Sequence, residues 1–177
     1  MSRGILRRFV CLGAPAMLAG CGFQPVYMPT ASNNAGPAQR DMAAVNVPVI
    51  PERPGQLLRQ ALQRELGNDS GTPAAYDLRV AFSISGEGIS IQDNNIATRV
   101  RFIGIASWTL TDRNKQQTVL TTGSARSLDG LNVFNQQYFA ADLETETVQR
   151  RIANNVAQQI ATQLAIWFRQ RAAEQVG

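Results

Sequence analysis

The residues whose types and spacing most clearly indicate chemistry stand near the start of the chain and are Leu18, Ala19, Gly20 and Cys21. An arginine-rich segment and an apolar run over residues 9–19 precede the cysteine, as in a secretory signal peptide that ends in small residues. The run is shorter than the roughly 20 apolar residues that span a bilayer as a helix. The spacing predicts export, cleavage after Gly20, and attachment of acyl chains to Cys21 as an N-acyl group and an S-diacylglycerol.

The basic charge of the chain belongs mostly to this leader. Residues 1–20 carry three arginines and no acidic residue, so the mature chain has 14 basic and 13 acidic side chains, against a net charge of +4 for the whole sequence. A strongly basic domain would indicate a nucleic-acid partner. Without the leader that indication disappears, and we expect no nucleic acid to bind.

The side chains available for catalysis or metal binding are few. There is no histidine, Cys11 leaves with the leader, and Cys21 is used for lipidation. Zinc sites built on His or Cys and nucleophilic triads that need an imidazole base are therefore excluded. We expect no catalytic residue, no metal site and no cofactor other than the covalent lipid.

The mature chain divides into a tether and one domain. Residues 21–44 are predicted to be the lipidated N-terminus and a flexible tether, because residues 28–44 are rich in Ala, Asn, Gly and Pro without apolar periodicity. Residues 45–177 form the domain. Its predicted strands cover 45–49, 76–91, 97–110 and 118–128, with an irregularity near Gly86 and Gly88. A helix over 57–66 is predicted from leucines at helical spacing and from Gly67, which stands where a C-terminal cap belongs. A second helix over 140–171 is predicted from an apolar row at every fourth position from Val148 to Phe168. The order β-α-β-β-β-α predicts a single α+β domain with a mixed, mostly antiparallel four-stranded sheet packed against two helices.

Alternation along the strands predicts an outward-facing patch of arginines and isoleucines. The core faces should carry Val100, Phe102, Trp108 and Leu110 on one strand and Val119, Thr121 and Ala125 on the next. The opposite face should carry Arg99, Arg101, Ile103 and Ile105. Pairing about the turn at 112–117 places Arg126 nearly opposite Ile103 and diagonal to Arg101. The arginines Arg99, Arg101 and Arg126 are thus candidate contacts for a phosphorylated lipid, since guanidinium groups bind phosphate and apolar neighbours suit acyl chains. A solvated face whose isoleucines cover a protein partner is an equal alternative.

The start of the mature chain resembles a known family. Its residues Cys21-Gly22-Phe23-Gln24-Pro25-Val26-Tyr27 resemble the C-G-F-x-P-(L/V)-Y opening of the lipopolysaccharide-assembly lipoproteins, the LptE/RlpB family. The order of elements, the sequence Thr98-Arg99-Val100-Arg101 in the hairpin region and a long C-terminal helix rich in Ala, Gln and Arg extend the resemblance. Val26 stands where leucine is common.

The resemblance implies a function without catalysis. Members of this family assemble with and plug the large β-barrel of the outer-membrane lipopolysaccharide translocon (LptD), and they bind lipopolysaccharide on its way to the cell surface. We therefore expect a lipid-anchored protein on the periplasmic side of the outer membrane. Gly22 after the lipidated cysteine, rather than Asp, resembles the signal for sorting to that membrane.

Two other classes remain open on the residues alone. Another accessory lipoprotein of the envelope, such as a secretin pilot or an auxiliary subunit of a transporter, would share the lipidation signal but lack the Gly-Phe-x-Pro-x-Tyr opening. An envelope hydrolase would need paired carboxylates, for which Asp129 or Glu87 with Glu144 are the candidates. Carboxylates at turns and helix starts are usually caps or solvated charges, so the enzyme ranks last.

Overall fold

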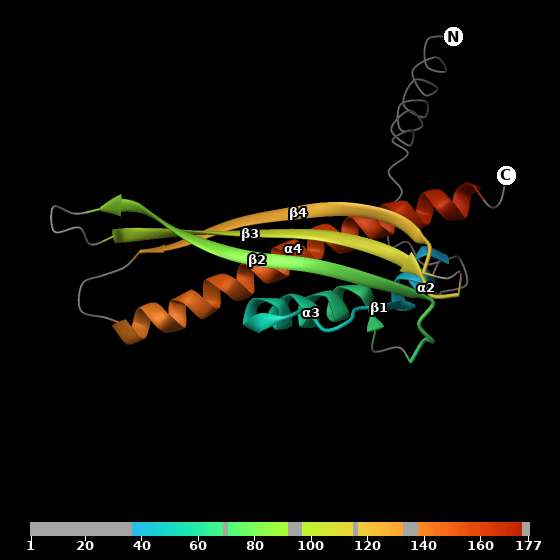
Figure 1. Cartoon of the computed structure of the whole chain (residues 1–177), viewed down its shortest axis with the longest axis horizontal. Coiled ribbons are helices and arrows are strands. Elements are labelled where there is room, and N and C mark those ends of the chain that lie inside the picture. The colour runs from blue at the N-terminus through green and yellow to red at the C-terminus, as the bar shows by residue number, and fades with distance from the viewer. Residues whose placement is uncertain (1–36, 69–70, 92–96, 115–116, 133–137, 175–177) are drawn as a thin grey trace, which may run out of the picture.

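A four-stranded sheet with helices on one face forms the body of the protein (Figure 1). The computed structural model describes residues 37–68, 71–91, 97–114, 117–132 and 138–174. In chain order the elements are α2 (Pro37–Ala43), β1 (Val45–Asn46), α3 (Glu52–Leu66), β2 (Tyr76–Ile91), β3 (Ala97–Asp112), β4 (Val119–Asn132) and α4 (Tyr138–Glu174). The predicted α+β class is confirmed, and α2 is a helix that the sequence did not predict.

The strands follow one another across the sheet in the order β1-β2-β3-β4. The short β1 runs parallel to the start of β2, and the three long strands form an antiparallel meander. The irregularity expected near Gly86 and Gly88 occurs just after them, where the register between β2 and β3 shifts between Gly88 and Ser90. These long strands hold residues far apart in sequence at fixed positions on two faces.

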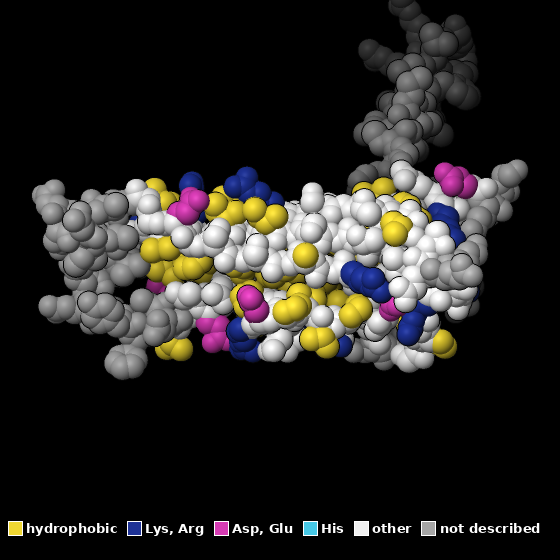
Figure 2. Space-filling model, in the orientation of Figure 1, with side chains coloured by type: hydrophobic (Ala, Val, Ile, Leu, Met, Phe, Trp, Pro, Cys, Tyr) yellow, Lys and Arg dark blue, Asp and Glu magenta, His cyan; other side chains and the backbone are white. Residues whose placement is uncertain are grey.

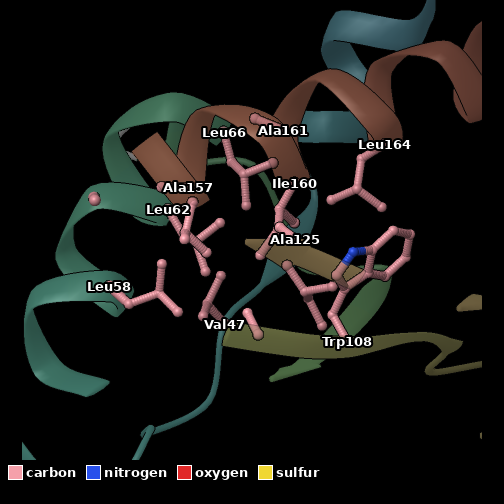
Figure 3. Packing of buried hydrophobic residues seen from close by; sticks show 14 of the residues in the cluster. Val47, Leu58, Leu62, Leu66, Trp108, Ala125, Ala157, Ile160, Ala161 and Leu164 are labelled. Carbon is pink, nitrogen blue, oxygen red and sulfur yellow. The ribbon is translucent and has the colours of Figure 1, made fainter. Parts of the chain in front are cut away.

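Helix α4 crosses the inner face of the sheet, and its apolar residues recur every fourth position as predicted. That row is at most 1% exposed and consists of Val148, Ile152, Val156, Ile160, Leu164 and Phe168. A second buried row contains only alanines, at positions 153, 157, 161 and 165. Figure 3 shows Leu58, Leu62 and Leu66 of α3 directed toward the part of α4 that carries Ala157 and Ala161. Small side chains on α4 therefore leave room for the leucines of α3.

Two glycines on the inner face let large side chains approach the sheet closely. A Cβ atom added to Gly104 of β3 would overlap Cγ2 of Ile152, and one added to Gly123 of β4 would overlap the ring of Trp108. Ile152 is fully buried and Trp108 is 4% exposed. Both glycines are therefore required by packing rather than by backbone conformation.

Helix α3 follows the leucine spacing that predicted it. Its last turn closes at Gly67, whose φ of 70° is left-handed and whose N–H points to the carbonyls of Arg64 and Gln63. Glycine adopts this conformation without the steric penalty that a Cβ brings. The predicted glycine cap is confirmed.

The boundary between tether and domain lies earlier than predicted. Residues 37–44 were expected to belong to a flexible tether, but 37–43 form α2, which packs against α4. Met42 is 3% exposed and Ala44 is 7% exposed, so both belong to the folded core. The predicted boundary at residue 45 is therefore wrong. The predicted signal peptide, Cys21 and the remainder of the tether lie outside the described residues.

The edge of β4 that faces away from β3 is covered by amide side chains of α4. Gln159 accepts a hydrogen bond from the Arg126 N–H at 3.4 Å and donates one to the Arg126 carbonyl at 3.0 Å. Gln163 donates to the Ser124 carbonyl at 3.0 Å and accepts from the Trp108 indole N–H at 3.1 Å. These contacts satisfy backbone groups that an exposed edge strand would otherwise offer to another chain.

Of the helices in the described ranges, none has the length and apolar character needed to cross a membrane.

Candidate functional site

The register of the sheet places the predicted arginine patch on the outer face, away from the helices. Ile105 lies opposite Arg126 and Ile103 lies opposite Leu128. The sequence predicted that Arg126 lies nearly opposite Ile103. This predicted register is wrong by two residues of β3, because Arg126 lies opposite Ile105. The physical reason has two parts. The turn is one residue longer than predicted, since Thr111 lies opposite Val119, and a register shift between Leu110 and Thr111 inserts one further residue of β4 into the ladder.

The same shift changes which residues of β4 are buried. Val119 was expected in the core, but it is 57% exposed. Ala125 is buried as predicted, and Thr121 is half-buried. On β3 the predicted core face is confirmed, since Trp108 and Leu110 are buried and Val100 and Phe102 are half-buried.

We call the outer-face cluster the basic-apolar patch, consisting of Arg99, Arg101, Arg126, Ile103, Ile105 and Leu128. Its three arginines are exposed, Ile105 is 52% exposed and Leu128 is 50% exposed. Ile103 faces the same side but is only 9% exposed. Figure 2 shows hydrophobic and basic side chains next to each other along the upper margin of the molecule, over the long strands. The sequence missed Leu128, although its alternation with Arg126 along β4 was a signal for it.

The charges of the patch are only partly compensated. Arg101 donates a hydrogen bond to Glu87 of β2 at 2.9 Å, and both side chains are about half exposed, at 47% and 54%. Such exposed pairs contribute roughly 0.2–1 kcal/mol, so a ligand phosphate can compete for the guanidinium. Within the described ranges, the side chains of Arg99 and Arg126 have no ion-pair partner. The patch therefore offers positive charge beside exposed apolar surface.

A shallow hollow adjoins the patch on the same sheet. Its volume is about 540 Å³, and it spans the middle of β2, β3 and β4. The outer-face residues that line it are small or hydroxylic apart from one arginine, and they are Arg79, Ala81, Ser107, Thr109, Thr122 and Ser124. The next row along the strands contains Ile105 and Arg126. An elongated molecule bound at the patch could therefore extend into this hollow.

The carboxylates considered for catalysis do not form a pair. Glu87 lies on the outer face beside Arg101, whereas Asp129 faces α4 and accepts a hydrogen bond from Arg151 at 2.6 Å. This hydrogen bond is the main cause that lowers the pKa of Asp129, and the Gly130 N–H also contributes. Glu144 lies close enough to Arg151 to raise its pKa, but less than Asp129 does. Asp129 therefore acts as an ion-pair anion that joins β4 to α4.

The Asp129–Arg151 pair gives a pH-dependent contribution to stability. Because the pKa of Asp129 is lower in the folded chain, its contribution is present above the unfolded pKa and is lost as the pH falls through the folded pKa. Asp129→Asn should therefore lower the free energy of unfolding by about 0.5–1 kcal/mol at pH 7 and change it much less near pH 2. Urea unfolding followed by circular dichroism at both pH values measures this. An equal loss at both values would mean that packing, not charge, connects the two elements.

No group of three or more potential metal-ligating residues is found in the described ranges of the chain.

An α+β domain with a long helix behind a meander is also the fold of several solved lipoproteins. A putative lipoprotein from Caulobacter crescentus is 24% identical, with a TM-score of 0.62 over 74% of this chain and 95% of that one. The uncharacterized lipoprotein B from Nitrosomonas europaea is 13% identical, with a TM-score of 0.51 over 70% of this chain and 81% of that one. At these identities the likeness shows the fold alone. A comparison with curated proteins gives no match.

The sequence itself shows to which family the chain belongs. Residues 23–164 match the family described as lipopolysaccharide-assembly, LptE. The match includes most of the opening motif, all of the sheet and most of α4. The chain belongs to the lipopolysaccharide-assembly (LptE) family, as its opening residues predicted.

Proposed function

We propose that this protein is a lipid-anchored, non-enzymatic lipoprotein on the periplasmic side of the outer membrane. It assembles with the β-barrel of the lipopolysaccharide translocon, plugs it, and binds lipopolysaccharide during insertion at the cell surface. Membership of the LptE family supports the pathway. The lipidation signal ending in Cys21 supports the anchor, and Gly22 supports outer-membrane sorting.

The observation that carries lipopolysaccharide binding is the basic-apolar patch. Lipopolysaccharide carries phosphates and acyl chains on one molecule. The guanidinium groups of Arg99, Arg101 and Arg126 suit the phosphates, because they donate paired, charge-assisted hydrogen bonds. Ile105 and Leu128 suit the acyl chains, because their exposed apolar surface loses contact with water when a chain covers it.

The proposal fits a protein that acts by binding inside a larger partner. The hydrophobic core lies on the helical side of the sheet, so residues of the outer face are not needed to hold the domain together. Substitutions on that face should therefore separate binding from folding.

Reversing two arginines together should reduce lipopolysaccharide binding at least tenfold. Charge-assisted hydrogen bonds contribute roughly 1.5–3 kcal/mol each, and Arg101→Glu with Arg126→Glu also introduces repulsion toward phosphate. Binding of the purified full chain to labelled lipopolysaccharide measures the change, and thermal unfolding checks the fold. A matched control is Arg64→Glu with Arg150→Glu, which reverses two exposed arginines on the helices. Equal binding by the patch variant and the control would remove the patch as the binding site.

A further inference from the structure

One acidic side chain lies beside the arginines of the basic-apolar patch. Glu87 of β2 is directly opposite Arg101 of β3 in the register, and its carboxylate accepts a hydrogen bond from that guanidinium at 2.9 Å. On the other side of Arg101, the opposite residue of β4 is Gly130, which has no side chain. Of the two residues directly across from Arg101, only Glu87 is therefore charged.

Arg101 is the central arginine of the patch. Arg99 lies two residues before it on the same strand, and Arg126 lies opposite Ile105, four residues after it. A phosphate held by two neighbouring arginines of the patch therefore shares the guanidinium of Arg101 with Glu87.

The outer face carries little other negative charge. Among the described outer-face residues of β2, β3 and β4, the acidic ones are Asp77 and Glu87. Ten residues of β2 separate the two positions, which is roughly 33 Å along a strand. Asp77 is paired there with Arg113 at 3.4 Å. Glu87 is thus the acidic residue that reduces the positive charge of the patch.

We infer that Glu87 is a built-in competitor of the ligand phosphate at Arg101, and that it makes lipid binding at the patch weaker and faster to reverse. The inference rests on the proposed binding of lipopolysaccharide at this patch. A protein that passes its ligand on must release it, and differences in affinity at one binding surface lie mostly in the rate of release.

The charges give the direction and the size of this effect. Carboxylate and phosphate bind a guanidinium through the same kind of charge-assisted hydrogen bond. A phosphate at Arg101 therefore either displaces Glu87, which breaks the ion pair, or lies beside it, where like charges repel. Two unit charges about 4 Å apart in water change a binding constant roughly fivefold, and a phosphate monoester carries about −1.5 to −2 charges at pH 7. Removing the charge of Glu87 should strengthen binding.

A positioning role for Glu87 predicts the opposite result. A carboxylate that served mainly to hold Arg101 in the orientation for binding would weaken binding when it is removed. The pair is exposed, so its loss should change the stability of the fold little. The sign of the change in affinity therefore distinguishes a competitor from a positioning residue.

Glu87→Gln in the full lipidated chain, purified in detergent, tests this sign. Glutamine keeps the size of the side chain and removes its charge. The Kd for labelled lipopolysaccharide should fall at least about threefold, mainly through slower release. The gain should shrink between about 0.1 M and about 1 M salt, because the Debye length falls from about 10 Å to about 3 Å. Glu65→Gln, which removes an exposed charge of α3, is the matched control and should leave the Kd unchanged.

A double-mutant cycle tests whether Arg101 is the point of competition. In an Arg101→Gln background, Glu87→Gln should improve binding less than about twofold, because the guanidinium for which the carboxylate competes is gone. An unchanged or weaker affinity of Glu87→Gln, or an equal gain in both backgrounds, would overturn the inference alone. A natural chain that binds no lipopolysaccharide would overturn the proposed function and the inference with it.

Discussion

Gly104→Val is expected to lower the free energy of unfolding by about 3 kcal/mol or more, because the inner face of β3 has no room for a side chain at this position. An added Cβ would overlap Cγ2 of Ile152 and would approach Cε2 of Phe82 to 3.3 Å. Ile152 is fully buried in the α4 row and cannot rotate toward solvent. The substitution must move α4 away from the sheet, which disturbs packing along the helix. Since domains are stable by about 5–15 kcal/mol, this is a large fraction of the total.

Urea unfolding of the full chain measures this loss, and a double-mutant cycle isolates its cause. Gly104→Ala should be destabilising in the natural background and much less so together with Ile152→Ala, which removes the overlapping Cγ2. Gly86→Ala is the control on the neighbouring strand, where the nearest atom is Cε1 of the half-buried Phe102 at 3.1 Å. Additive effects of the Gly104 and Ile152 substitutions would mean that this contact does not set the distance between helix and sheet.

Cys21→Ala is expected to abolish lipidation and, with it, recovery of the mature chain in the outer membrane. Each buried methylene of an acyl chain contributes roughly 0.8 kcal/mol to membrane binding, and two or more chains are needed for stable anchoring. Removing the cysteine that carries them removes the whole contribution. Intact mass measurement should show the natural chain starting at Cys21 with the added mass of its lipid, and membrane fractionation should show where it resides.

The other cysteine of the sequence provides the control. Cys11→Ser changes a residue within the predicted leader, so the mature chain should keep its mass and its location. If both cysteine variants fractionated like the natural chain, Cys21 would not be the anchor.

The sequence predicted most strongly those features that follow from simple periodicity. The four-residue spacing from Val148 to Phe168 placed one face of α4 in the core, and all six residues of the row are buried. The two-residue spacing on β3 placed Arg99 and Arg101 on the outer face, where both are exposed. Each of these predictions depends only on the geometry of one element.

Features that depend on pairing between elements were harder to predict. The register shift beside Leu110 exposed Val119, and together with a turn one residue longer than predicted it moved Arg126 from Ile103 to Ile105. Neither strand contains a residue that marks such a shift. The ion pair between Arg101 and Glu87 joins strands whose register was unknown. Helix α2 was missed because Pro, Ala and Asn surround it. Its only signal was the four-residue spacing of Ala38 and Met42, both of which are buried.

The most direct test of the central claim is the identity of the partner. The tagged full chain should be purified from detergent-solubilised outer membranes, and the proteins bound to it should be identified by mass spectrometry. The account predicts recovery of the large lipopolysaccharide-translocon β-barrel in stoichiometric amount. Recovery of a secretin, a transporter or no partner, from cells that express the chain well, would contradict it.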